Sequence, residues 1–290
     1  MLPNPEARAI AIEARDVTLY YRMSPVLNRV TLAIPEGAVV GLVGRNGAGK
    51  STLLRCLVGL TAPHDDGRCS LLGSPSLDLP DTVRARLGYA AQTPDLYGWL
   101  DGHAHLQRLA ALYPSYSELR ALELAVSLDL PLGLRASRLS IGDQQKLSIL
   151  LAMAHDPDLL ILDEPVASLD PLARRQFMRA LFERRDAGAA PRTVLVSSHL
   201  LTDLERVVSH IVFMREGRVQ LADAWDAVAE NLELLVLHRE SDAETRAAGV
   251  LHRRQIGDEW RLVVDRRAVP PETPPGQRMN LDDLFAELNS

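Results

Sequence analysis

The sequence predicts an α/β protein built on a mostly parallel sheet, with an antiparallel β layer near its N-terminal end. Three observations carry this prediction: apolar residues that alternate early in the chain, unbroken apolar runs further on, and amphipathic stretches between those runs. Alternation is typical of strands with one buried face, whereas unbroken runs favour central strands buried on both faces. An order of strand, helix, strand then implies parallel pairing.

The first elements are half-buried strands, one fully buried strand and a helix. Alternating apolar residues between positions 10 and 34 indicate strands joined by turns such as Pro35-Glu36-Gly37, and residues 38–43 form an unbroken apolar run. That run leads directly into a glycine-rich turn. A helix is expected at residues 51–58, and the Pro, Asp and Gly residues of positions 61–67 indicate a loop after it.

The middle of the chain is predicted to be helical. From about residue 99 to residue 154, apolar residues recur at spacings of three and four. Two apolar runs, residues 159–162 and 194–196, then flank an amphipathic stretch from Pro171 to about Arg185, and a proline suits the first turn of a helix. The apolar positions of the helical pattern are Leu106, Leu109, Leu112, Leu119, Leu122 and Ala125.

The chain of 290 residues divides by composition at about residue 220. Residues 221–290 carry the whole net charge of −6, and residues 1–220 balance at zero. We therefore expect a main domain at 1–220, with a helical subdomain at about 99–154, and a small acidic extension at 221–290. Prolines make residues 269–276 a stiff linker, and residues 281–288 could form a short amphipathic helix.

Composition also limits the class of partner. A negative net charge gives no general attraction to nucleic acid or anionic lipid, so any anion needs a local site. The sequence has no apolar run of the ~18 residues that a membrane-spanning helix needs, and its first residues lack the pattern of a signal peptide. Cys56 and Cys69 fit no metal or disulfide spacing and are expected to be core residues in a reducing, cytoplasmic compartment.

A phosphate site is predicted between the buried strand and the helix that follows it. The run Gly44-Arg45-Asn46-Gly47-Ala48-Gly49-Lys50-Ser51 matches the Walker A pattern in the context that the pattern requires. Glycines let backbone N–H groups curl around phosphate oxygens, Lys50 adds a positive charge on the β- and γ-phosphates, and Ser51 offers a hydroxyl to Mg²⁺. The candidate nucleotide-binding residues here are Gly44, Asn46, Gly47, Ala48, Gly49, Lys50, Ser51 and Thr52.

Two carboxylates end the buried run at residues 159–162. Asp163 and Glu164 would lie where an open α/β sheet presents ligand groups, at the carboxyl end of a strand. Asp163 is expected to hold the metal, and Glu164 to accept a proton from the attacking water. Together with the Walker A run, this pair predicts ATP and Mg²⁺ as cofactors.

The order of several further motifs identifies a family. Gln92 follows a strand-like run, Leu139-Ser140-Ile141-Gly142-Asp143-Gln144-Gln145 precedes a helix, Ser168-Leu169-Asp170 follows the acidic pair, and His199 closes the next strand. This set resembles the nucleotide-binding subunit of ABC transporters over residues 8–220. The resemblance implies a P-loop ATPase fold with an antiparallel β subdomain, a central mostly parallel sheet, a helical signature subdomain and a small C-terminal extension.

The resemblance implies roles for residues outside the Walker A run. Tyr21 matches the aromatic residue that stacks on adenine, although the adjacent Tyr20 is an alternative, and Gln92 matches the glutamine that contacts Mg²⁺ or water and couples to the permease. His199 matches the switch histidine that contacts the γ-phosphate. Asp170 is also placed among the nucleotide contacts. Ser140 and Gly142 match the signature motif, which contacts ATP held by the opposite subunit.

A composite site implies a dimer. This chain carries both the Walker A and the signature halves, so a homodimer is the economical hypothesis. Ile141 and Asp143 depart from the usual Leu-Ser-Gly-Gly-Gln, which leaves a heterodimer open. Asp143 is predicted to weaken the ATP-bound dimer modestly because it brings a carboxylate close to the phosphate.

The hypothesis of a transporter subunit requires a separate integral membrane permease. The subunit would bind to this permease at the cytoplasmic face of the membrane. Residues 93–100, with Tyr97 and Trp99, are predicted to line the groove for a permease helix, or else to pack against the helical insert. The end of the tail, residues 281–288, resembles ABC-2-type exporters, which favours export. The alternatives are a soluble ABC-type ATPase acting on ribosomes or nucleic acid, and a catalytically silent partner.

Overall fold

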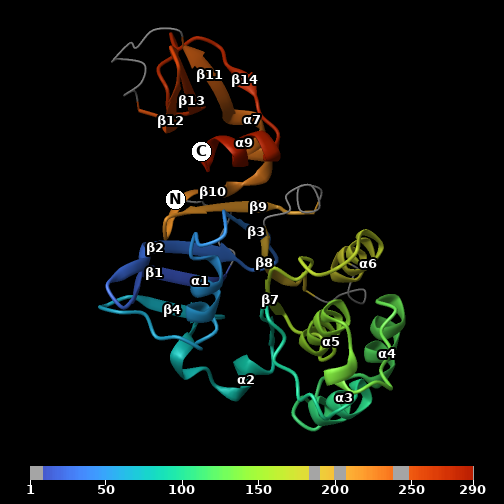
Figure 1. Cartoon of the computed structure of the whole chain (residues 1–290). Helices are drawn as coiled ribbons and strands as arrows, with labels where there is room; N and C mark the ends of the chain where they lie inside the picture. The colour runs from blue at the N-terminus through green and yellow to red at the C-terminus, as the bar shows by residue number, and fades with distance from the viewer. Residues whose placement is uncertain (1–8, 183–189, 199–206, 238–247, 290) are drawn as a thin grey trace.

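The computed structural model describes residues 9–182, 190–198, 207–237 and 248–289. Within these residues the strands form three sheets, and Figure 1 shows the helices of residues 102–182 gathered at one side of the central sheet. The predicted architecture, with an antiparallel layer, a mostly parallel central sheet, a helical region and a C-terminal extension, is confirmed.

The antiparallel sheet forms because one face of each long strand is apolar. Ile12 lies opposite Ile34 and Ala14 opposite Leu32, and all four side chains are buried. This face packs against the central sheet, while the neighbouring Glu13 and Arg15 of the first long strand are partly or fully exposed. In spatial order the strands are β2 (Ser24–Pro35), β1 (Ile10–Tyr21), β4 (Arg68–Leu71) and β5 (Ser74–Pro75).

The central sheet brings separate chain segments to one edge. Its strands pair in parallel except for β10, which pairs antiparallel with β9. Strand β8 lies between β3 and β7, so the turn after β3 and the carboxylates at the end of β7 come to the same edge. The spatial order is β10 (Arg218–Ala224), β9 (His210–Arg215), β3 (Val39–Val43), β8 (Thr193–Ser198), β7 (Leu159–Asp163) and β6 (Leu87–Ala90).

Helix α1 (Lys50–Leu57) packs between the antiparallel and the central sheet. Leu53, Leu54 and Leu57 are fully buried, and each such side chain contributes roughly 1.5–3 kcal/mol of transfer free energy. Cys56 on this helix and Cys69 on β4 are also buried and form no disulfide, so the prediction that they are core residues is confirmed. Burial raises the pKa of Cys56 to about 11, which keeps its thiol protonated.

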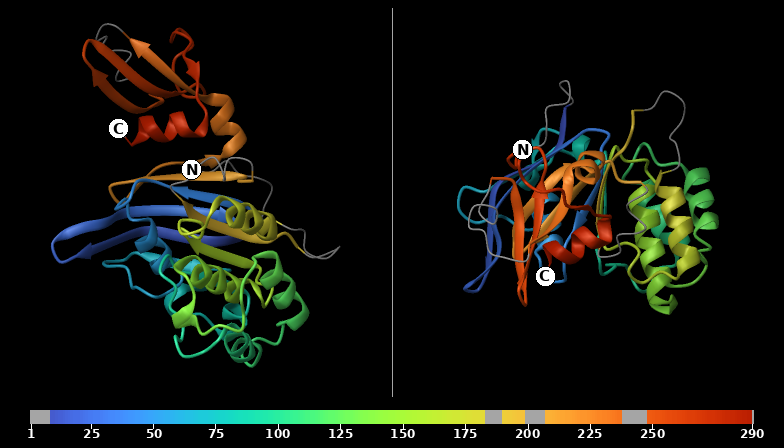
Figure 2. Two further views of the ribbon diagram at one scale, coloured as in Figure 1. Left: turned by 45° about the vertical axis from the view of Figure 1, so that its right-hand side comes forward. Right: turned by 90° about the horizontal axis from the view of Figure 1, so that it is seen from above.

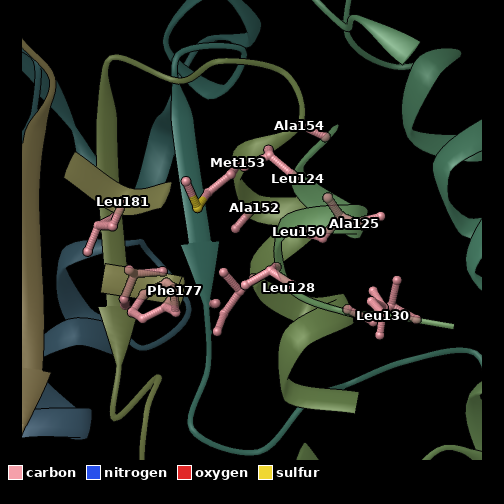
Figure 3. Packing of buried hydrophobic residues seen from close by; sticks show 14 of the residues in the cluster. Leu124, Ala125, Leu128, Leu130, Leu150, Ala152, Met153, Ala154, Phe177 and Leu181 are labelled. Atoms are coloured by element: carbon pink, nitrogen blue, oxygen red, sulfur yellow. The ribbon is translucent and has the colours of Figure 1, made fainter. Parts of the chain in front are cut away.

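The helical region packs onto the central sheet through α5. Figure 3 shows Leu124, Ala125 and Leu128 beside Leu150 and Met153, in one cluster of buried residues. The main helices are α3 (Gly102–Ala110), α4 (Glu118–Ser127), α5 (Ile141–Met153) and α6 (Pro171–Phe182). Shorter turns are η1 (Ser76–Asp78), α2 (Asp81–Arg84) and η2 (Ala136–Arg138).

The predicted apolar positions of this region are only partly buried. Leu106 and Ala125 are buried, but Leu112, Leu119 and Leu122 are exposed. Helix α3 ends before Leu112. Helix α4 instead buries its small residues together with one leucine, because close packing against α5 needs short side chains at that face.

The C-terminal extension has a sheet of its own, which the sequence pattern did not predict. Strand β10 belongs to the central sheet and continues to Ala224, past the boundary expected at residue 220. Helix α9 (Leu281–Leu288) matches the predicted helix and lies between the extension's sheet and the β9–β10 hairpin (Figures 1 and 2). The other elements are α7 (Trp225–Asn231), β11 (Leu232–Leu237), β12 (Val250–Ile256), β13 (Glu259–Asp265) and β14 (Gln277–Arg278).

Candidate functional site: an ATP-binding cleft

The turn between β3 and α1 can form only with glycine at certain positions. Gly47 and Gly49 have φ angles of +83° and +100°, a region that side chains with a Cβ rarely adopt. A Cβ on Gly49 would also lie 2.7 Å from the carbonyl oxygen of Val26 on β2. Two of the glycines in the Walker A run are therefore required by backbone geometry as well as by any ligand.

Helix α1 begins with an open N-terminus. Its N-cap residue is Gly49, which supplies no side-chain hydrogen bond, and its first turn holds no acidic residue. The first N–H groups of a helix have no intrahelical acceptor and carry partial positive charge. The end of α1 is thus suited to an anion such as phosphate.

A cleft of about 360 Å³ lies against this helix end. Nine of the residues that line it belong to the predicted site, from the Walker A run, the Gln92 loop and the end of β7. Val26 and Arg45 complete the lining. The predicted residues are Asn46, Gly47, Ala48, Gly49, Lys50, Ser51, Thr52, Gln92 and Glu164.

Lys50 is held inside this cleft with its charge balanced. The side chain is only 6% exposed, and its Nζ donates to the carbonyl oxygen of Gly44 at 2.7 Å. It also forms an ion pair with Glu164, with 3.3 Å from Nζ to Oε1. Because an unpaired buried charge is costly, these contacts explain how a lysine can sit in the cleft.

The end of β7 is organised by a serine that the sequence analysis missed. The Ser197 hydroxyl on β8 donates to Asp163 Oδ1 at 2.7 Å and accepts from the backbone N–H of Glu164 at 2.9 Å. Glu164 has a φ of +47°, a left-handed conformation that costs a non-glycine residue about 1 kcal/mol. Ser197 therefore fixes the orientation of both carboxylate residues.

Gln92 reaches the cleft from the helical side of the molecule. It lies in the loop after β6, and the side chain of Gln145 on α5 donates to the carbonyl oxygen of the preceding Ala91 at 3.5 Å. The loop that brings Gln92 to the cleft thus contacts the helix that begins at the signature motif.

The signature residues lie away from the cleft of their own chain. Ser140 is the N-cap of α5, where its hydroxyl accepts from the N–H of Asp143 at 3.1 Å and donates to the Asp143 carboxylate at 2.7 Å. Lys146 neutralises that carboxylate at 3.2 Å. Gly142 packs close to Ser168: a Cβ on Gly142 would lie 3.0 Å from the Ser168 carbonyl oxygen.

Among the described residues, the predicted Gly44, Tyr21, Asp163 and Asp170 are not in the cleft lining either. Tyr21 is half exposed at the end of β1, whereas Tyr20 stacks on His64 with ring centroids 5.7 Å apart. The carboxylate of Asp170 accepts from the N–H groups of Leu172 and Ala173 at the start of α6, and the bond from Ala173 lowers the pKa of Asp170. His199 lies outside the described residues.

The fold and cleft together define a nucleoside triphosphatase of the P-loop class. A glycine turn after a buried parallel strand, a lysine in the cleft beside an open helix end, and carboxylates at the end of the second strand along are its components.

Comparisons with known proteins then give the family. The ABC transporter family profile matches residues 27–167. The bacitracin transport ATP-binding protein of Enterococcus faecalis is 35% identical over 72% of this chain and 67% of its own length. The Nod factor export ATP-binding protein I of Neorhizobium galegae is 32% identical over 73% and 62%. A dimeric ATP-binding cassette in a post-hydrolysis state with ADP and Pi superposes with a TM-score of 0.65, at 25% identity, over 74% of this chain and 98% of that one.

The chain belongs to the ABC transporter family as an ATP-binding subunit, and it is an ATP hydrolase of the ABC type. Among the residues that the structure describes, no helix combines the length and the apolar character needed to cross a bilayer.

Proposed function

We propose that ATP binds in the cleft beside α1 and that its hydrolysis drives substrate movement through a separate membrane permease. The observation that carries this proposal is the placement of Lys50 inside the cleft, 3.3 Å from Glu164. The main domain, residues 1–220, would supply the site. The triphosphate would lie along the backbone N–H groups of the Walker A turn and on the N-terminus of α1.

Glu164 is the proposed general base, and its contact with Lys50 makes that role depend on ATP. The ammonium of Lys50 is paired with this carboxylate. Phosphate oxygens would compete with Glu164 for Lys50, which would free the carboxylate to accept a proton from water. Gln92 and His199 are the proposed partners of that water and of the γ-phosphate.

The residues around the cleft fit Mg²⁺. Ser51 and Gln92 line the cleft and offer oxygen ligands, and Asp163 directly precedes Glu164, which also lines the cleft. Magnesium in nucleotide sites is held by one or two carboxylates together with phosphate oxygens, rather than by an all-protein cage. Mg²⁺ would supply charge neutralisation on the β- and γ-phosphates. We propose Ser51, Gln92 and Asp163 as the residues that hold it.

The dimer is proposed to be a homodimer that closes on ATP. Ser140 and Gly142 lie away from the cleft of their own chain, which suits a contact with ATP on the opposite subunit. Tyr21, exposed at the end of β1, is the proposed adenine-stacking residue, because the ring of Tyr20 is already occupied by His64. A heterodimer with a different cassette is the alternative.

The experiment for this proposal is the Glu164→Gln variant. Without the base, ATP should bind but not turn over, so the protein should shift from monomer to dimer on adding MgATP, as measured by light scattering during gel filtration. The wild type serves as control and should dimerise only transiently. A variant that binds ATP yet stays monomeric when pure, but dimerises with a co-expressed cassette, indicates the heterodimer.

The permease contact is proposed to include Tyr97 and Trp99. Both side chains are more than half exposed, with ring centroids 5.1 Å apart, so they do not fill the core of the helical region. The backbone N–H of Tyr97 donates to Nε2 of the buried His105, which fixes this aromatic pair. Replacing both by Ala should abolish transport in vesicles and spare basal ATP turnover; an equal loss of both activities opposes the proposal.

We propose export as the direction of transport and the cytoplasmic face of the membrane as the location, reached through the permease. The tail at residues 281–288 and the Nod factor export relative support export. No observation on the chain favours the alternative of an ATPase that acts on ribosomes or nucleic acid, and the net charge of −6 opposes it.

A further inference from the structure

The last turn of α9 is held by two arginines from the central sheet. Arg45, in the Walker A turn, donates from Nη1 to the carbonyl oxygen of Asn289 at 3.2 Å. Arg215, at the end of β9, donates from Nη1 to the carbonyl oxygen of Leu288 at 3.1 Å. The last carbonyls of a helix lack intrahelical partners and carry partial negative charge, so two guanidinium groups stabilise this end.

Arg45 therefore faces two regions at once. It lines the nucleotide cleft, and it also lines a second cavity of about 340 Å³ together with Arg215, Glu216 and Asn289. The two cavities share Arg45, Asn46, Gly47 and Ala48. The first half of the Walker A turn, residues 45–48, thus separates the nucleotide cleft from the end of the extension.

Helix α9 is a rigid support for this contact. Leu281, Leu284 and Leu288 are almost fully buried in a cluster with Phe213 of β9 and Leu221 of β10. Its first turn is capped by Asn280, which accepts from the N–H of Asp283 at 2.8 Å. Near its other end, Glu287 is paired with Arg261 of β13, so a displacement of the extension's sheet would move the helix with it.

The backbone of Arg45 also contacts Lys50. The Nζ of Lys50 lies 3.5 Å from the Arg45 carbonyl oxygen, in addition to its bond to Gly44. One residue thus contacts the phosphate-binding lysine through its carbonyl and the extension through its guanidinium group.

We infer that Arg45 is a positioning residue through which α9 sets the shape of the Walker A turn, and with it the affinity for ATP. The inference rests on the proposed nucleotide site. With α9 docked, the first half of the turn is already fixed in the conformation that receives phosphate, so less conformational entropy is lost on binding. A partner that shifts the extension would weaken ATP binding without touching the cleft.

The test compares variants of Arg45 and Arg215, made in the whole chain, in steady-state ATP turnover. Arg45→Ala and Arg215→Ala should each raise KM for ATP about fivefold, with kcat within a factor of about two, because both release the end of α9. The double variant should raise KM no further than the larger single variant, since both act through one contact. Arg45→Lys and Arg215→Lys should recover part of the affinity.

Arg215→Ala is the decisive variant, because Arg215 does not line the nucleotide cleft. The matched control is Arg266→Ala, which removes an arginine that contacts Glu233, Thr273 and Pro274 within the extension. This control should leave KM unchanged even where thermal denaturation shows a lower Tm.

Two results would separate failure of this inference from failure of the proposed site. If Lys50→Ala abolishes ATP turnover but Arg215→Ala has a normal KM, the role of α9 is overturned and the proposed site stands. ATP turnover that survives Lys50→Ala instead removes the proposed nucleotide site, and the inference with it.

Discussion

The N-terminal turns of helices α1 and α5 differ in capping and in charge, although both are expected to contact the same γ-phosphate from different subunits. At α1 no side chain caps the first N–H groups, and no acidic residue lies in the first turn. At α5, Ser140 caps the first turn and Asp143 adds a carboxylate. One helix end is open to an anion, whereas at the other the Ser140 hydroxyl already accepts from the N–H of Asp143.

The difference indicates that the two helices contribute differently to ATP binding. The sequence contains only two lysines, Lys50 and Lys146, and each lies in the first turns of one of these helices. Lys50 lies in the cleft and is the proposed phosphate ligand, while Lys146 pairs with Asp143 and cancels its charge. Affinity for ATP should therefore come mainly from α1, and α5 should contribute an adjustable, weaker contact that closes the dimer.

The largest effect is expected for Lys50→Ala. Removing the only cationic side chain of α1 that faces the cleft should weaken ATP binding and turnover by about two orders of magnitude, because a buried charged contact is lost. Binding is measured with a fluorescent ATP analogue and turnover by phosphate release. Arg55→Ala, at the opposite end of the same helix, is the control and should bind normally. Equal behaviour of the two variants would contradict the importance assigned to the start of α1.

An intermediate effect is expected when α1 is made to resemble α5. Thr52→Asp places a carboxylate in the first turn of α1, where like charge repels the triphosphate, and ATP affinity should fall roughly tenfold or more. Thr52→Asn has the same shape without the charge and should retain most of the affinity. If the two variants bind ATP equally, charge at this helix end is not what governs affinity.

The smallest effect is expected when α5 is made to resemble α1. Asp143→Gln removes the carboxylate that holds the Ser140 hydroxyl, so this hydroxyl can turn to the partner's phosphate. In the Glu164→Gln background, the ATP-bound dimer should become about threefold to fivefold tighter by analytical ultracentrifugation. Asp143→Glu keeps the charge and serves as control. A dimer that is unchanged or looser with glutamine refutes the weakening assigned to Asp143.

Residues with a local sequence pattern were predictable, and residues placed by long-range packing were not. The Walker A run and Glu164 lie together in the cleft as expected, because glycine geometry and strand ends act over a few residues. Ser197 escaped notice because a hydroxyl in an apolar strand has no pattern; only the register of β8 against β7 brings it to Asp163.

The fold shows the same limit. Hydrophobic periodicity predicted helices in the middle of the chain but did not determine which leucines are buried: Leu119 and Leu122 are exposed, whereas Leu124 is buried. A helix with apolar residues on several sides leaves the buried face to be decided by its neighbours. The sheet of the extension was missed because a local pattern indicates strands but not their pairing partners, such as β14 beside β11.

One glycine in the β9–β10 turn joins three parts of the molecule. The N–H of Gly217 donates to the carbonyl oxygen of Ala48 at 3.0 Å, and its own carbonyl accepts from Asn28 of β2 at 2.8 Å. Its φ is +73°, and a Cβ there would collide with the backbone of Val26. This corner therefore has no room for a side chain, and a methyl group added here would disturb both the outer strand β2 and the Walker A turn.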